Sequence, residues 1–155
     1  MQKPKDIRMQ NETSAASPGA TGVSLVDGDT AVRHARQLML RSEDYAVRSY
    51  ATCAALLADP RARDYPCIIL DMEMEAIDGL ALLREMRTSG WRGRALLLDG
   101  LAPGSPVLTE AERHGDTVLQ RGIGDRALLI AIAASINGDA PARRPAGSSS
   151  NADDA

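Results

Sequence analysis

Residues 67–80 read CIILDMEMEAIDGL, and this stretch decides the fold class. Its first four residues are continuously apolar, which is typical of a strand that helices cover on both faces of a parallel sheet. Asp71 follows the apolar run directly, and a helical pattern occupies residues 80–88. A buried strand, an acidic turn and a helix together form the repeating unit of an α/β sheet.

The same unit recurs on both sides of this stretch. We expect further strands at residues 23–26, 46–50, 95–98 and 117–120, and further helices at 31–43, 53–58, within 105–114 and at 125–136. Five strands that alternate with five helices predict one parallel sheet with helices on both faces, because parallel crossovers place the helices there.

The two ends of the chain differ in composition from the middle. Residues 1–21 and 139–155 are mostly small and polar, with proline, glycine and serine among them. Such segments bury too little apolar surface to offset the entropy lost on ordering. We therefore predict disordered tails at both ends and a single domain over residues 22–138.

Charge and composition exclude several functional classes. The formal net charge is −3, which offers no electrostatic basis for binding nucleic acid or an anionic membrane. No apolar run reaches membrane-spanning length, and no secretory signal is evident. Cys53 and Cys67 form neither a disulfide framework nor a metal-type cluster, and we interpret both as small buried hydrophobes. A cytoplasmic location is the expectation.

Charged residues stand at the ends of four predicted strands. Asp27, with Asp29 close by, follows the first, Asp71 the third, Asp99 the fourth and Arg121 the fifth. The carboxyl ends of parallel strands share one edge, where ligands bind, so these side chains should converge. Crowded carboxylates need a cation such as Mg²⁺, or a balancing charge from Arg121. The alternative is that they are solvated loop acids at ordinary strand ends.

Three motifs resemble the receiver domain of bacterial response regulators. They are residues 25–29 (LVDGD), 69–74 (ILDMEM) and 77–80 (IDGL), and the similarity extends over about residues 23–137. The second motif is the specific one, with a methionine three residues after the aspartate. The resemblance implies a flavodoxin-like doubly wound fold with a five-stranded parallel sheet in the order 2-1-3-4-5.

The resemblance also implies a chemistry for the strand ends. Asp71 matches the phosphoacceptor, which takes a phosphoryl group from a phosphohistidine on a histidine kinase or phosphotransfer protein. Asp27, Asp29, Asp71 and the backbone of Glu73 are the implied Mg²⁺ ligands. Asp99 matches a residue that carries a hydroxyl in the family, and Arg121 matches a lysine.

Several of these positions depart from the family pattern. Gly28 replaces an acid that ligates the metal directly, so Mg²⁺ binding should be weakened. A carboxylate at Asp99 would repel a phosphoryl group of about −1.5 to −2 charge. Arg121 keeps the charge of the lysine but lacks its compact ammonium. We predict weak phosphoryl acceptance, with Arg121 paired to Asp71 or to Asp99.

We interpret the chain as a stand-alone receiver without enzymatic activity, whose output passes to a protein partner. By resemblance, the contact surface would be the face built from about residues 105–136. One alternative is a binding module that never accepts phosphate. Another, of similar fold, is a phosphatase with Asp71 as nucleophile, although Glu73 stands where such hydrolases carry a second aspartate.

Overall fold

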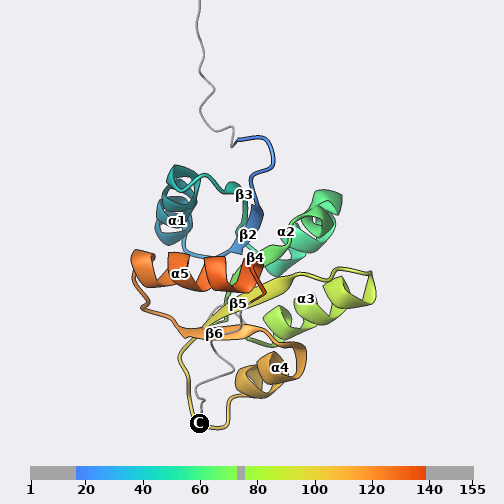
Figure 1. Cartoon of the computed structure of the whole chain (residues 1–155). Helices are drawn as coiled ribbons and strands as arrows, with labels where there is room; N and C mark the ends of the chain where they lie inside the picture. Colours follow the sequence, from blue (N-terminus) through green and yellow to red (C-terminus); the bar gives the residue numbers. More distant parts are fainter. Residues whose placement is uncertain (1–16, 73–75, 139–155) are drawn as a thin grey trace, which may run out of the picture.

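The computed structural model describes residues 17–72 and 76–138, and over these residues it forms a five-stranded parallel sheet flanked by helices (Figure 1). The strands are β2 (Gly22–Val26), β3 (Ala46–Tyr50), β4 (Cys67–Asp71), β5 (Arg94–Asp99) and β6 (Thr117–Gln120). Their order in the sheet is β3-β2-β4-β5-β6, and all pairs are parallel. Counted along the described chain this is 2-1-3-4-5, which confirms the predicted doubly wound, flavodoxin-like α/β fold.

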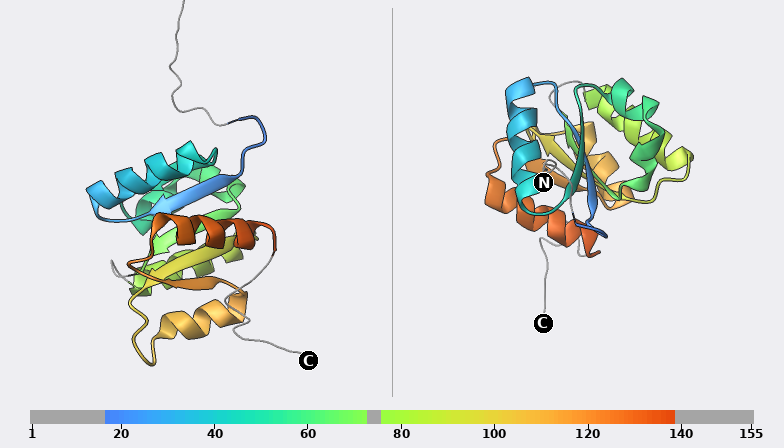
Figure 2. Two further views of the ribbon diagram at one scale, coloured as in Figure 1. Left: turned by 60° about the vertical axis from the view of Figure 1, so that its left-hand side comes forward. Right: turned by 90° about the horizontal axis from the view of Figure 1, so that it is seen from above.

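Helices cover both faces of the sheet. On one face lie α1 (Thr30–Ser42) and α5 (Asp125–Ile136), and on the other lie α2 (Cys53–Ala58), α3 (Ala76–Thr88) and α4 (Pro106–His114), as Figure 2 shows. In the described ranges, no helix is both long and apolar enough to cross a membrane.

The central position of β4 in the sheet explains why its sequence shows no alternation of apolar and polar residues. Cys67 and Ile69 belong to the core beneath α1 and α5, whereas Ile68 and Leu70 belong to the core beneath α2, α3 and α4. All four are fully buried. Because both faces of the strand are covered, apolar residues are needed at every position.

Three helices begin at side-chain caps. The Asp29 carboxylate accepts a hydrogen bond from the Val32 amide, and the Thr52 hydroxyl accepts one from the Ala55 amide. The Ser105 hydroxyl caps α4 in the same way. Such residues satisfy amide groups that have no partner within the helix.

The structure differs from the sequence prediction in two elements. Helix α3 begins at Ala76, four residues before the predicted start, and therefore contains Asp78 and Gly79 within it. A short 3₁₀ helix, η1 (Pro60–Asp64), lies between the expected helix at 53–58 and the strand β4, where no element was predicted. It begins where the Asp59 carboxylate accepts a hydrogen bond from the Arg61 amide, next to a proline at the first helical position.

The last residues before β2 are in contact with the domain. The amide and hydroxyl of Ser17 both donate to the Asp44 carboxylate, at 3.2 and 3.1 Å. The Ala46 amide donates to the Thr21 carbonyl. Residues 17–21, which were assigned to the N-terminal tail, thus bond to the turn before β3. The remainder of both predicted tails lies outside the described residues.

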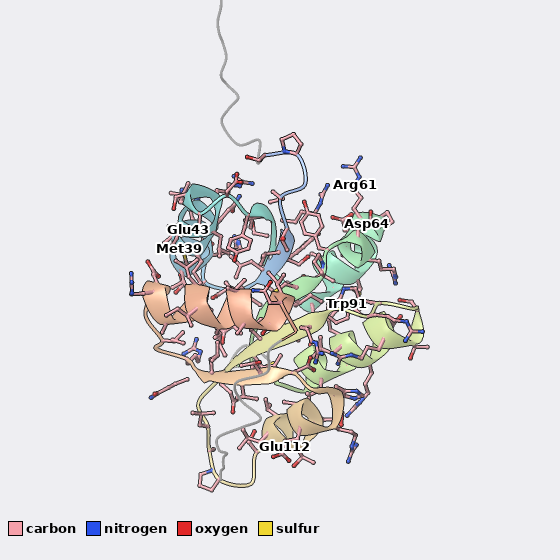
Figure 3. All side chains as sticks on the ribbon, in the orientation of Figure 1. Met39, Glu43, Arg61, Asp64, Trp91 and Glu112 are labelled. Carbon is pink, nitrogen blue, oxygen red and sulfur yellow. The ribbon has the colours of Figure 1, made fainter. Side chains whose placement is uncertain are left out.

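A buried ion pair joins α3 to the amino-terminal end of the sheet. Asp116 Oδ1 accepts hydrogen bonds from Arg87 Nη2 at 2.7 Å and from the Ala95 amide at 3.0 Å. The Asp116 side chain is only 1% exposed. Arg87 also lies over the ring of Trp91, just beyond the end of α3 (Figure 3). One carboxylate oxygen therefore links a helix, a strand and a turn.

Replacing Asp116 by alanine is expected to lower the free energy of unfolding by about 3 kcal/mol, because it leaves Arg87 and the Ala95 amide without their acceptor. Urea denaturation followed by circular dichroism measures the change. The matched control is Glu112→Ala, an exposed acid on α4 (Figure 3), which should change stability by less than about 0.5 kcal/mol. Equal losses in the two variants would contradict the structural role of Asp116.

The two cysteines should differ in reactivity. Cys67 is fully buried, and burial raises the pKa of its thiol to about 12, whereas Cys53 is only half-buried. The prediction that both are buried is thus right only for Cys67. Near pH 8 a disulfide reagent such as DTNB should react rapidly with one thiol in the native protein and with both in urea, because only an accessible thiolate attacks. Two equally fast native thiols would contradict this burial.

Candidate functional site

The residues at the carboxyl ends of the strands lie along one edge of the sheet. Asp71 and Asp99 are the last residues of β4 and β5, and Asp27 and Arg121 directly follow β2 and β6. Backbone hydrogen bonds continue past the strand ends: the Asp27 amide donates to Tyr50, and the Arg121 amide donates to the carbonyl of Asp99. The backbone therefore holds these residues in fixed register at one edge, as the sequence predicted.

Asp71 and Arg121 form a two-pronged ion pair. Arg121 Nε donates to Asp71 Oδ1 at 2.8 Å, and Arg121 Nη2 donates to Asp71 Oδ2 at 3.1 Å. The Asp71 side chain is 5% exposed and that of Arg121 is 48% exposed. Both carboxylate oxygens are thus engaged by one planar guanidinium, an arrangement that a lysine ammonium does not form.

Asp27 is held by helix α1. Its Oδ2 accepts a hydrogen bond from Arg36 Nη1 at 3.0 Å, and its Oδ1 accepts one from the Asp29 amide at 2.9 Å. Its backbone carbonyl accepts a further hydrogen bond from Arg33 Nη1 at 2.7 Å. Asp27 is nearly buried, at 2% exposure, so these partners replace the water that would otherwise solvate its charge.

A hollow of about 150 Å³ lies between these groups. Three carboxylates and two guanidiniums line it, together with one apolar side chain: Asp27, Asp29, Asp71, Arg36, Arg121 and Val32. The side chain of Asp29 is used as the cap of α1. The predicted convergence of the first and third strand ends with Arg121 is therefore present in the structure.

Asp99 has a different local environment. Its Oδ2 accepts a hydrogen bond from the Leu101 amide at 3.1 Å. Leu101 has a φ of 60°, a left-handed conformation that leucine rarely adopts. At the position where the family carries a hydroxyl, the carboxylate of Asp99 thus holds a strained turn between β5 and α4.

The described residues do not fit a magnesium site. Within residues 17–72 and 76–138, no group of three or more histidine, cysteine or acidic residues is arranged to hold a metal ion. Both oxygens of Asp27 and both oxygens of Asp71 already accept hydrogen bonds, and Gly28 supplies no carboxylate. The predicted backbone ligand at Glu73 lies outside the described residues.

The sequence analysis missed Arg36 and Arg33. A signal was present, because Asp29, Arg33 and Arg36 recur at helical spacing and therefore share one face of α1. Which acid at the strand ends these arginines reach depends on how α1 packs on the sheet. Arg121 had two predicted partners, and the structure selects Asp71.

Comparisons with known proteins agree with this geometry. Residues 23–119 match the family model of the response regulator receiver domain. The transcriptional regulatory protein FixJ of Azorhizobium caulinodans is 31% identical over 77% of this chain and 56% of its own length. The tetrathionate response regulatory protein TtrR of Salmonella typhimurium is 27% identical over 79% and 60%. The chain spans less than two thirds of these curated relatives.

Solved structures show the same fold. A CheY-like response regulator receiver protein from Methanospirillum hungatei is 18% identical, with a TM-score of 0.65 over 77% of this chain and 95% of its own. The chemotaxis protein CheY4 of Vibrio cholerae is 22% identical, with a TM-score of 0.65 over 75% and 98%. With the family match over most of the sheet, these findings lead to one assignment: the chain belongs to the response regulator receiver domain family of two-component signalling.

Proposed function

We propose that this chain is an atypical receiver whose candidate phosphoacceptor, Asp71, accepts phosphoryl groups only weakly. Receiver domains take part in phosphorelays with histidine kinases or phosphotransfer proteins, and phosphorylation is typical of the family. The observation that carries the proposal is the ion pair in which Arg121 engages both oxygens of Asp71. The proposed location, by family, is the cytoplasm.

Phosphoryl transfer requires a carboxylate oxygen with an available lone pair. One Oδ of Asp71 attacks phosphorus, the bond between phosphorus and the donor's leaving group breaks, and an acyl phosphate forms. The Arg121 guanidinium holds both oxygens and lowers their nucleophilicity, so its contact with the attacking oxygen must weaken as the new bond to phosphorus forms. A charge-assisted hydrogen bond contributes about 1.5–3 kcal/mol when shielded, and the half-exposed Arg121 places this one at the lower end. The ion pair therefore slows the reaction without forbidding it.

Asp99 adds to this restraint. It ends the strand next to Asp71, and a phosphoryl group on Asp71 would bring a charge of about −1.5 to −2 toward the edge that Asp99 shares. The Asp99 carboxylate already accepts a hydrogen bond from the Leu101 amide. An ionised carboxylate carries no hydrogen that it could donate to the phosphoryl oxygens. Both effects favour the unphosphorylated form.

Output through a protein partner is the second part of the proposal. Two large apolar side chains remain exposed on the helices α4 and α5, within residues 105–136. Leu108 on α4 is 38% exposed, and Ile130 on α5 is 64% exposed. A protein partner that covered these side chains would remove their apolar surface from water, which favours association.

Two other functions compete with this one. A binding module that never accepts phosphate would keep the same ion pair permanently. An Asp71-nucleophile phosphatase is less favoured, because receiver domains are generally signalling modules without enzymatic activity. The labelling experiment below separates the first alternative from the proposal, since only a phosphoacceptor acquires a phosphoryl group.

Incubation of the full chain with acetyl phosphate and Mg²⁺ is expected to label a minor fraction of the molecules with one phosphoryl group, because Arg121 restrains Asp71. Intact-mass spectrometry measures the added mass. Asp71→Asn should abolish the label, because an amide is not a nucleophile at this pH. The matched control is Asp64→Asn, an exposed acid at the end of η1, which should label like the wild type.

Two results would contradict the proposal. Stoichiometric labelling of the wild type would show that the pocket is not restrained. A complete lack of labelling, also after prolonged incubation, would remove the phosphoacceptor role and favour the binding module.

Arg121→Lys is expected to raise the initial labelling rate by about tenfold, because a lysine keeps the charge but cannot hold both oxygens of Asp71, which removes about 1.4 kcal/mol from the barrier. The same mass measurement over a time course gives the rate. Arg126→Lys, on the exposed first turn of α5, is the control and should leave the rate unchanged. An unchanged or lower rate in Arg121→Lys would refute the restraining role of the ion pair.

A further inference from the structure

The acidic edge of the sheet holds its counter-ions within the chain. Three carboxylates line the hollow, and two guanidiniums face them, which reduces the local formal charge from −3 to −1. Arg121 balances Asp71, and Arg36 balances Asp27. Clusters of carboxylates otherwise need a bound cation or bound protons.

The Arg36–Asp27 ion pair differs from the surface pairs of this protein. The side chains are 15% and 2% exposed, whereas Arg113, which pairs with Glu110 on the surface of α4, is 66% exposed. Little water screens the buried pair, so its two charges interact more strongly than those of a surface pair. Removing either partner would leave an uncompensated charge close to the hollow.

A second arginine of α1 strengthens this arrangement. Arg33 Nη1 donates to the backbone carbonyl of Asp27, and the Asp29 amide donates to its side chain. A divalent cation that ligated Asp27 would have to share Oδ2 with the Arg36 guanidinium, whose positive charge repels it, or share Oδ1 with the Asp29 amide. Asp29 already uses its Oδ1 as the cap of α1.

We propose that Arg36 is a built-in counter-ion of Asp27 that, together with Arg121, takes over the charge-balancing role of a divalent cation in this pocket. Two features then exclude the cation: Gly28 withholds a ligand, and Arg36 occupies Asp27. Removing Arg36 lets the cation bind weakly, at millimolar concentration, and restoring a carboxylate at position 28 as well lets it bind tightly. This inference does not depend on phosphoryl acceptance by Asp71, because cation binding is measured without any phosphoryl donor.

The test is a double-mutant cycle on the full chain, with Mn²⁺ binding measured by titration calorimetry and by the electron paramagnetic resonance of free Mn²⁺. The four proteins are the wild type, Gly28→Asp, Arg36→Gln and the double variant. We expect no binding by the wild type at millimolar Mn²⁺. The double variant should bind at least about tenfold more tightly than Gly28→Asp, because one positive charge next to the site has been removed.

The control is Arg92→Gln, which removes an exposed arginine just before β5, at the opposite end of the strands. Combined with Gly28→Asp it should leave the Mn²⁺ affinity of that variant unchanged. The proposal is overturned if the wild type binds Mn²⁺ tightly, or if Gly28→Asp binds equally well with and without Arg36. It is also overturned if the folded double variant does not bind.

Stability gives a second readout that does not require a new ligand. Arg36→Gln leaves the buried Asp27 without its counter-ion, so the melting temperature should fall. Millimolar Mg²⁺, compared with NaCl at equal ionic strength, should restore part of this loss by binding the folded state only. The wild type and Arg92→Gln should show no specific Mg²⁺ effect. If Mg²⁺ restores none of the melting temperature that Arg36→Gln loses, the proposal that Arg36 replaces a divalent cation is refuted.

Discussion

Negative charge crowded at one edge of a parallel sheet is the constraint on which this structure depends. Parallel strands all end on the same side, so the acids that follow them are brought together whether or not they attract one another. Here Asp27 is 2% and Asp71 5% exposed, and each has a guanidinium within hydrogen-bonding distance. Arg36 on α1 and Arg121 after β6 neutralise these two carboxylates.

The opposite end of the sheet contains another pair of an acid and an arginine, and this pair has a structural role. Asp116 is also buried and also paired with an arginine, but the oxygen that Arg87 binds accepts a backbone amide of β5 as well. That carboxylate is part of the framework. Arg121 is half exposed beside an open hollow, so its contact with Asp71 can be exchanged for another partner. Exposure of the cation, more than burial of the acid, distinguishes the candidate site from the structural pair.

Membership of the receiver family therefore sets the fold, whereas the residues at the edge of the sheet set its local charge balance. Gly28 lacks the carboxylate that the family pattern supplies, Asp99 holds a strained turn, and Arg121 holds both oxygens of Asp71. Together with Arg36 they form an edge whose charge is balanced by the chain itself, so a partner or a phosphoryl group must compete with contacts that already exist.

The sequence by itself determined the alternation of strands and helices and the edge where the acids meet, because these follow from local patterns and from parallel topology. The order of the strands in the sheet came from the resemblance to the receiver family. Only the tertiary structure decided which acid each arginine meets. Arg121 pairs with Asp71 instead of Asp99, and Arg36 reaches Asp27, because the packing of α1 and the register of β6 place those groups. Which partner a long side chain meets depends on distances of about a few ångströms between packed elements. No local sequence pattern encodes those distances.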